Sequence, residues 1–235
     1  MTGLMLKGQV AVVTGATSGI GRAIAEELVA GGAAVWAIGR RGEKLREIFE
    51  RHPGVTPYQA DLTDDGQVDQ FREALTRHGD LDILVHAAAI IKLASFRDAL
   101  VGDLDAQYRI NVRAPYLLTQ ALLPLLSQRG QIVFLNSSAG LVARAGVGQY
   151  SATKHALKAV ADSLREELHP SGRRVLSVFA GRTATPMQEA IHEMENRPYD
   201  PTRYMDAGEV ARAVVDALRF ETAEIKEINL RPRFD

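Results

Sequence analysis

The sequence predicts an α/β domain built on a parallel β-sheet, and three features support this fold class. Short apolar runs rich in Val, Ile and Ala alternate with longer segments of helical periodicity, which is typical of strands joined by crossover helices. Most of these runs are uniformly apolar, as expected of strands covered on both faces. No repeat, low-complexity tract or linker divides the 235 residues. We therefore expect a single domain over residues 1–235.

Seven apolar runs are the expected strands. They are Val10–Thr14, Ala34–Ile38, Val55–Gln59, Ile83–His86, Ile132–Leu135, Val175–Phe179 and, with a weaker pattern, Ile225–Leu230. Parallel strands joined by helices cross over in the right-handed sense. The expected product is a Rossmann-type doubly wound sheet with helices on both faces.

The segment from Arg182 to Asp206 is the irregular part of the chain. It carries Pro186, Pro198 and Pro201 among mixed charges. Long loops in compact domains are usually functional or disordered. We expect a partly helical lid over the site, and a plain surface insertion is the alternative.

Composition excludes several classes of function. The chain is 46% hydrophobic and 24% charged, and its formal net charge is -1, which gives no broad basic footprint for nucleic acid or an anionic membrane. Cysteine is absent, so disulfide scaffolds and zinc–thiolate sites are excluded, and we expect no metal site. Neither a secretory signal nor an apolar run of ~18 residues is present. We expect a soluble cytoplasmic protein.

The first expected strand runs directly into a glycine-rich turn, and the first helix begins inside this turn. Gly15 allows a tight turn, Gly19 lets the backbone approach a pyrophosphate, and Gly21 lets the helix pack near the strand. The helix N-terminus presents free N–H groups and a partial positive charge to phosphates. The turn also contains Thr17, Ser18 and Ile20. It predicts a dinucleotide site, although a purely structural turn can also require such glycines.

Two arginines follow the second strand, where such folds meet the adenosine ribose. An acidic residue there binds the 2'-hydroxyl of NAD, whereas a basic one accommodates the 2'-phosphate of NADP. Arg40 and Arg41 can clamp a phosphate with charge-assisted hydrogen bonds. We therefore predict NADP(H) in preference to NAD(H). Arg40 is the stronger candidate, because Arg41 is also explained as a solvated charge in the first turn of a helix.

Further motifs follow the glycine-rich turn in order. Asn111 lies in an Asn-Val context, Ser137 precedes Tyr150 by 13 residues, and Tyr150 and Lys154 form a Tyr-x-x-x-Lys pattern. Residues four apart share one face of a helix, so the last two side chains can converge. With the glycine-rich turn, these motifs resemble the short-chain dehydrogenase/reductase family in its classical form over nearly the whole chain. The resemblance implies that these four residues are catalytic, with Ser138 as the alternative serine.

The resemblance also implies further cofactor contacts and an oligomer. The implied cofactor residues are Asp61 and Leu62 near adenine, the backbone of Ala87 and Ala88, Gly181, Thr183 and Thr185 near the nicotinamide, and Tyr150 and Lys154 themselves. Helices around Asn111–Ser127 and Tyr150–His169 resemble those that pair subunits in this family. A homodimer or homotetramer is therefore expected.

The sequence departs from the family pattern in two places. His86-Ala87-Ala88-Ala89 stands where the family usually carries Asn-Asn-Ala-Gly, so two amide side chains and one glycine are missing. These amides contribute hydrogen bonds that steady the central sheet. Ala180-Gly181 stands where members commonly have Pro-Gly, which affects the rigidity of the following loop.

The implied residues suit hydride transfer between NADP(H) and a carbonyl or alcohol. Negative charge develops on the substrate oxygen, and Ser137 can stabilise it by donating a hydrogen bond. Tyrosine has an ordinary pKa near ~10, and we expect Lys154 to lower the pKa of Tyr150 so that it serves as general acid and base. By resemblance, the helix of Asn111 holds a water that links Lys154 to solvent.

Two other functions remain open at this level. One is a catalytically weak nucleotide sensor or scaffold of the same fold, and the other is a different reaction, such as epimerisation or dehydration. We expect Lys92, Phe96, Arg144, Met187 and the segment Arg182–Asp206 to border the substrate pocket. Fold alone does not select the small-molecule substrate.

Overall fold

The computed structural model describes residues 6–50 and 52–233. In this part of the chain, seven parallel strands form one sheet with the order β3-β2-β1-β4-β5-β6-β7. The strands are β1 (Val10–Thr14), β2 (Ala34–Gly39), β3 (Val55–Gln59), β4 (Leu81–His86), β5 (Leu126–Ser137), β6 (Arg174–Ala180) and β7 (Glu227–Leu230). The predicted doubly wound, single-domain fold is confirmed.

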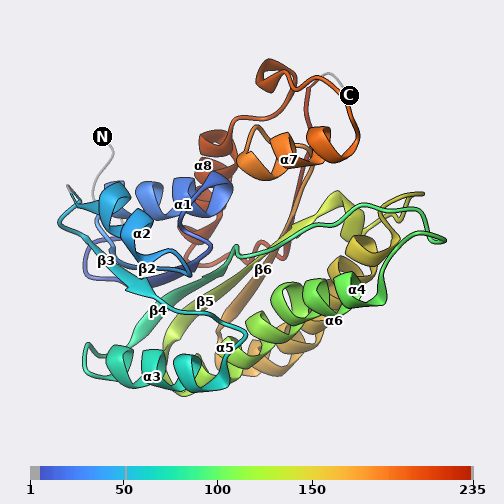
Figure 1. The fold of residues 1–235 in the computed structure, drawn as a ribbon. Helices are drawn as coiled ribbons and strands as arrows, with labels where there is room; N and C mark the ends of the chain where they lie inside the picture. The colour runs from blue at the N-terminus through green and yellow to red at the C-terminus, as the bar shows by residue number, and fades with distance from the viewer. Residues whose placement is uncertain (1–5, 51, 234–235) are drawn as a thin grey trace.

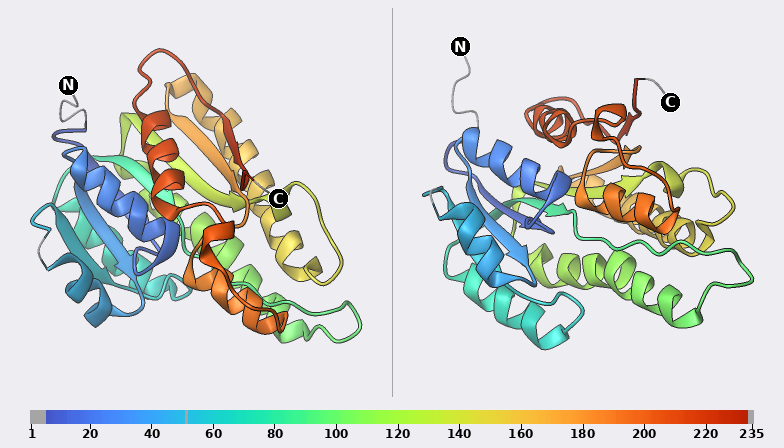
Figure 2. Two further views of the ribbon diagram at one scale, coloured as in Figure 1. Left: turned by 90° about the horizontal axis from the view of Figure 1, so that it is seen from above. Right: turned by 45° about the horizontal axis from the view of Figure 1, so that its top comes forward.

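Helices cover both faces of this sheet (Figures 1 and 2). They are α1 (Gly19–Ala30), α2 (Gly42–Phe49), α3 (Asp65–Thr76), α4 (Val101–Tyr108), α5 (Ala114–Leu122), α6 (Gly148–Leu168), α7 (Pro186–Met194) and α8 (Ala207–Leu218). α1, α2 and α8 pack on one face, and α3, α5 and α6 pack on the other. None of these described helices is long and apolar enough to cross a membrane.

Burial of both sheet faces explains the uniformly apolar strands. Side chains alternate between the two faces along a strand. In β1, Ala11 and Val13 therefore join the core under α1, α2 and α8, whereas Val12 joins the core over α3, α5 and α6. All three side chains are fully buried. A polar side chain at any of these positions would lose its hydrogen bonds to water and gain no hydrogen-bond partner inside the protein.

The helix expected over 111–127 has different bounds in the structure. A π-helical turn, Arg109–Arg113, precedes α5, and a 3-10 turn, Leu123–Leu125, follows it. Pro124 has no backbone N–H, so it cannot continue the α-helical hydrogen bonds. β5 then begins at Leu126, which pairs with Leu81 before a register shift. Ser127 is consequently a strand residue.

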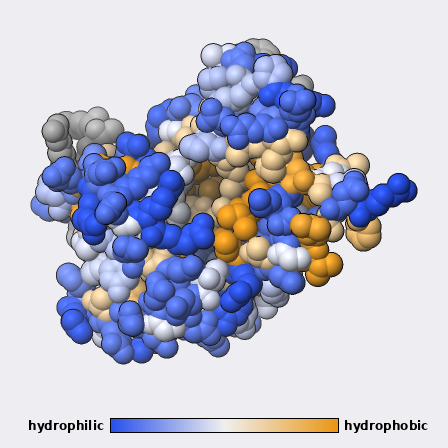
Figure 3. All heavy atoms as spheres, in the orientation of Figure 1, coloured by the Kyte–Doolittle hydropathy of each residue, from blue (hydrophilic) through white to orange (hydrophobic). Residues whose placement is uncertain are grey.

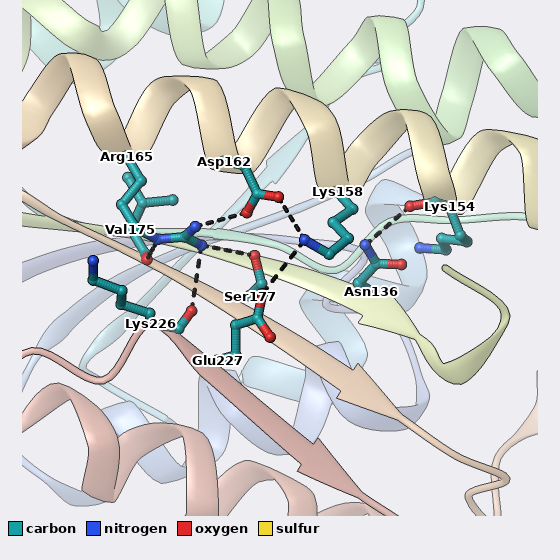
Figure 4. Close-up of polar contacts among 9 residues, drawn as sticks. All are labelled: Asn136, Lys154, Lys158, Asp162, Arg165, Val175, Ser177, Lys226 and Glu227. Atoms are coloured by element: carbon teal, nitrogen blue, oxygen red, sulfur yellow. Dashed lines mark hydrogen bonds and ion pairs between the residues drawn. The ribbon is translucent and has the colours of Figure 1, made fainter. Parts of the chain in front are cut away.

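Polar side chains on α6 hold the edge strand β7 in place (Figure 4). The buried Arg165 donates hydrogen bonds to the carbonyl oxygen of Val175 at 2.9 Å, to Ser177 Oγ at 3.1 Å and to the carbonyl oxygen of Lys226 at 3.3 Å. Asp162 pairs with Arg165 and with Lys158. This network explains how a short strand with a weak sequence pattern joins the sheet.

A buried histidine replaces one of the missing family amides at the end of β4. His86 Nε2 lies 2.8 Å from Thr119 Oγ1 of α5, and its ring stacks on Phe134 of β5 at a centroid distance of 4.9 Å. Burial lowers the pKa of His86 to about 3. The folded chain therefore holds this imidazole neutral.

Replacing His86 by Asn should make the protein less sensitive to acid. The folded chain keeps His86 neutral, whereas the unfolded chain protonates it below about pH 6.5. Protons then favour the unfolded state, so stability from this group is present above pH 6.5 and falls as the pH drops toward 3. At pH 5 the loss amounts to about 2 kcal/mol. Urea unfolding of wild type and H86N at pH 8 and pH 5 measures it.

The exposed His169 supplies the matched control for this experiment. H169N should keep the wild-type loss of stability between pH 8 and pH 5. An H86N variant that loses as much stability as wild type would contradict the buried, neutral histidine.

Candidate functional site

A large cleft opens at the C-terminal ends of the parallel strands. Its volume is about 1370 Å³, and Figure 3 shows it as a hollow near the centre of the surface. Each residue that the sequence predicted to contact a cofactor lines this cleft. They are Gly15, Thr17, Ser18, Gly19, Ile20, Gly21, Arg40, Arg41, Asp61, Leu62, Ala87, Ala88, Tyr150, Lys154, Gly181, Thr183 and Thr185. The fold thus brings residues from most of the chain to one place.

The glycine-rich turn leaves no room for side chains. A Cβ on Gly15 would lie 2.8 Å from Ala88 Cα, and one on Gly21 would lie 2.6 Å from the carbonyl oxygen of Gly15. Gly15 and Gly19 also have positive φ angles of 68° and 55°. The Ser18 side chain makes no capping bond to α1, and no acidic residue occupies the first turn. The backbone N–H groups at this helix end remain available to an anion.

Arg40 and Asp61 lie at the end of the cleft formed by β2 and β3. Asp61 accepts hydrogen bonds from the backbone N–H of Thr63 at 2.9 Å and from Thr63 Oγ1 at 2.8 Å. The backbone N–H of Thr63 holds the pKa of Asp61 below its usual value, and Arg40 lowers it further. The carboxylate is thus fixed and charged next to a basic group.

Ser137, Tyr150 and Lys154 meet deep in the cleft. Ser137 ends β5 and forms a side-chain hydrogen bond with Tyr150, which lies in the first turn of α6. Lys154 lies one turn further along α6, with its Nζ 5.7 Å from the centre of the Tyr150 ring. Lys154 Nζ donates a hydrogen bond to the carbonyl oxygen of Leu135 at 3.0 Å. Ser138, the alternative serine, also lines the cleft but is exposed.

Burial dominates the ionisation of this pair. Tyr150 is 7% exposed and Lys154 is 2% exposed. Burial raises the pKa of Tyr150 to about 12, although the hydrogen bond with Ser137 opposes this shift. Burial also lowers the pKa of Lys154 to about 8. The chain by itself therefore does not show the lowered tyrosine pKa that we expected from the lysine, and it holds Tyr150 as a neutral phenol at neutral pH.

Asn111 lies behind the cleft within the π-helical turn. It is 1% exposed, and its amide pairs with both backbone groups of Ile90 at 2.9 Å. Its Nδ2 also lies 3.1 Å from Thr153 Oγ1 on α6. Asn111 is absent from the described lining of the cleft, and it joins the segment after β4 to α6.

Thr14 takes over hydrogen bonds at the departure from the family pattern after β4. Its Oγ1 accepts from the backbone N–H of Ala87 at 3.0 Å and of Ala88 at 3.1 Å. Together with the pairing of His86 and Thr119, these bonds tie β4 to its neighbours. The sheet is therefore held without the missing amides.

The loop after Ala180-Gly181 is also held, although it lacks the proline of the family. Gly181 N donates to the carbonyl oxygen of Leu230 at 2.8 Å. Thr183 forms a β-bridge with Met205, and Thr185 accepts from Gln188 N to cap α7. Backbone pairing thus replaces the rigidity that a proline would supply.

The expected substrate residues divide into two groups. Arg144 and Met187 line the cleft, as predicted, whereas Lys92 and Phe96 are absent from its described lining. Phe96 is 99% exposed, because the segment after β4 carries it out into solvent. The prediction for Lys92 and Phe96 is therefore wrong.

Sequence reasoning missed residues that reach the cleft from the last part of the chain. They are Arg231, Pro232 and Arg233, whereas Arg197 and Arg203 belong to the segment 182–206 that was expected to border the site. Arg231 follows β7, and the residues after parallel strands gather at the same edge of the sheet. That rule, applied to the last expected strand, could have found Arg231.

Comparison with known proteins identifies the family. The short chain dehydrogenase family model matches residues 9–196. An uncharacterised oxidoreductase of Staphylococcus epidermidis is 33% identical over 97% of this chain and 98% of its own. An NADPH-dependent 3-dehydrocapnine reductase of Ornithobacterium rhinotracheale is 34% identical over 83% of this chain and 72% of its own. The structure of a putative short chain dehydrogenase from Pseudomonas syringae superposes with a TM-score of 0.87 at 29% identity, covering 96% of each chain.

This chain therefore belongs to the short-chain dehydrogenase family, as the motifs predicted. It is an oxidoreductase of that family, whose enzymes use a nicotinamide cofactor and act on small molecules.

Replacing Thr14 by Val should destabilise the fold at the edge of the cleft. Valine has a similar shape but cannot accept hydrogen bonds from the N–H groups of Ala87 and Ala88, so two partly buried donors lose their partner. We expect the free energy of unfolding to fall by about 1–3 kcal/mol. Urea titrations of wild type, T14V and T14S measure the change. The T14S variant keeps the hydroxyl, and a loss as large as that of T14V would contradict this role of the oxygen.

Proposed function

We propose that this protein is an NADP(H)-dependent oxidoreductase that interconverts a carbonyl compound and an alcohol, with Tyr150 as the proton-transfer residue. The observation that carries the proposal is the meeting of Ser137, Tyr150 and Lys154 inside the cleft that also contains the glycine-rich turn. The full set of predicted catalytic residues is Asn111, Ser137, Tyr150 and Lys154.

The cleft has the features that a dinucleotide requires. Gly15 and Gly21 have no room for a Cβ, and without side chains the backbone of this turn can approach a dinucleotide closely. The start of α1 has no side-chain cap, so it offers its N–H groups to a pyrophosphate. Bound there, the nicotinamide would give or accept a hydride. The chain's own residues must then orient the substrate and move its proton.

Proton transfer in this proposal runs from the Tyr150 hydroxyl to the substrate oxygen during reduction. Burial keeps the phenol protonated at neutral pH, as an acid must be before it donates. The Ser137 hydroxyl donates a hydrogen bond to the same oxygen and limits its movement. In the oxidation direction, the phenolate of Tyr150 takes the proton back.

Lys154 and Asn111 have different supporting roles. A pKa of about 8 leaves Lys154 mostly protonated at pH 7, so its ammonium stabilises the Tyr150 phenolate when this forms. In this proposal Lys154 would also contact the cofactor ribose. Asn111 acts as a positioning residue, because it fixes the segment at Ile90 relative to α6.

The preference for NADP(H) rests on Arg40 and Arg41. Both line the cleft after β2, and the acidic residue nearby, Asp61, is already engaged by Thr63. A guanidinium pairs with a 2'-phosphate by charge-assisted hydrogen bonds. The NADPH dependence of the 3-dehydrocapnine reductase relative gives further support.

Two structural expectations belong to the same proposal. The segment 182–206 acts as a lid, supported by α7 and by its contribution to the cleft lining. A homodimer or homotetramer forms through α5 and α6, supported by the exposed Tyr116 on α5. The cytoplasmic location remains a prediction from the sequence.

Replacing Tyr150 by Phe should abolish turnover and leave NADPH binding nearly intact. The change removes only the hydroxyl that transfers the proton, so we expect kcat to fall at least ~100-fold. NADPH fluorescence titration and reduction of a panel of aldehydes and ketones measure the two quantities. Full activity in Y150F would end the mechanism, and NADPH binding by wild type without any turnover would favour the sensor instead.

Replacing Arg40 by Asp should reverse the cofactor preference. The carboxylate repels the 2'-phosphate, so the KM for NADPH should rise roughly 10- to 100-fold, and the KM for NADH should rise less or fall. Steady-state kinetics with both cofactors tests this. Arg129, exposed at the start of β5, is the matched control, and R129D should leave the preference unchanged. Equal or better use of NADPH by R40D would refute the assignment.

A further inference from the structure

Basic side chains gather in the part of the cleft formed by the second half of the chain. Eight arginines line the cleft, and six of them follow β5, β6 or β7 in the chain: Arg144, Arg182, Arg197, Arg203, Arg231 and Arg233. Among the described lining residues, the acids are Asp61 and Glu195. The whole chain has 28 basic and 29 acidic residues, so this concentration of positive charge is local. Clefts lined by one sign of charge focus their field on an entering ligand.

The six arginines differ in their partners. Glu195 pairs with Arg182 at 3.4 Å and with Arg197 at 3.7 Å, so one carboxylate serves two guanidiniums. Within the described residues, the guanidiniums of Arg144 and Arg231 have no hydrogen-bond or ion-pair partner. Both residues are exposed and line the cleft. These two cations are therefore available to a ligand.

An apolar wall borders the same part of the cleft. It consists of Ile90, Ile91, Leu93, Leu141 and Val142. Figure 3 shows apolar side chains gathered beside the hollow. Val142 is 59% exposed, and it precedes Arg144 by two residues in the chain. A polar ligand alone would leave this wall in contact with water.

We infer that the substrate is a carbonyl compound with an apolar chain and an anionic group, a carboxylate or a phosphate, away from the carbonyl. The carbonyl lies at Tyr150 and Ser137, the chain contacts the apolar wall, and the anion pairs with Arg144 and Arg231. This substrate class rests on the function proposed above. Arginine suits it because its planar guanidinium binds carboxylate and phosphate in the same paired geometry.

The cofactor does not account for these arginines. Its 2'-phosphate is assigned to Arg40 and Arg41 after β2, and its pyrophosphate is assigned to the start of α1. Arg231 follows β7, the strand at the opposite edge of the sheet from β3 and β2. Arg144 lies in the segment that leads into α6, shortly before Tyr150. Both arginines thus belong to the side of the cleft where the substrate is held.

Binding of matched ligands tests the inference without relying on turnover. Octanoate, octyl phosphate and the neutral octanamide share one chain length, and calorimetric titration of the protein with excess NADP⁺ gives the Kd of each. We expect octanoate or octyl phosphate to bind about tenfold more tightly than octanamide. The tighter of the two anions identifies the source of the charge. Equal binding of the anions and the amide would overturn the inference.

Variants locate the anion within the cleft. R144Q and R231Q should each reduce the preference for the anion at least roughly threefold, because one charge-assisted pair is lost in each. R129Q, which changes an exposed arginine outside the cleft lining, should keep the wild-type preference. A preference that R144Q and R231Q both leave unchanged would overturn the assignment of these residues.

Turnover separates this inference from the proposed function. An oxo acid and its methyl ester, which lacks the charge and carries one additional methyl group, are compared as substrates with NADPH. Reduction of both with equal kcat/KM would overturn the anionic substrate class and leave the oxidoreductase proposal intact. Anion-selective binding without reduction of any ketone would overturn the proposed function and support the anion site.

Discussion

The packing of α6 against the end of β5 holds the candidate catalytic groups together, and the rest of the site depends on it. Lys154 Nζ donates to the carbonyl oxygen of Leu135. Asn136 Nδ2 donates to the carbonyl oxygen of Lys154 at 3.0 Å, as Figure 4 shows. A Cβ on Gly140 would lie 2.5 Å from Asn136 Oδ1 and 2.9 Å from the Lys154 carbonyl oxygen. Strand end and helix are therefore close enough that a serine and a tyrosine from different elements share a hydrogen bond.

Burial gives this pair its chemical character. Removing a phenol and an ammonium from water favours the neutral form of each, and the pKa values of Tyr150 and Lys154 move in opposite directions for that reason. The proposed acid is consequently protonated before reduction begins. Arg144 and Arg231 lie in a different environment, because both are exposed to solvent at the lining of the cleft.

Local patterns predicted the elements that depend on local chemistry. All seven strands were predicted: the five inner strands have buried faces that demand apolar residues, whereas the edge strands β3 and β7 are only partly buried. The glycine turn was predicted because its glycines lack space for a Cβ. Boundaries that depend on partners were harder to predict. β5 begins several residues before its apolar run, since Leu126 pairs with Leu81 ahead of a register shift. Nothing in the sequence pattern showed that His86 of β4 would pair with Thr119 of α5.

The sequence by itself determined the fold class, the order of the motifs and the spacing that places Tyr150 and Lys154 on one face of a helix. These properties follow from periodicity and residue type, which act over a few residues. Only the tertiary structure decided which distant residues share the cleft: it brought Arg144 and Arg231 to the lining of the cleft and left Phe96 in solvent. It also decided the ionisation of Tyr150, because burial depends on all the elements packed around a side chain.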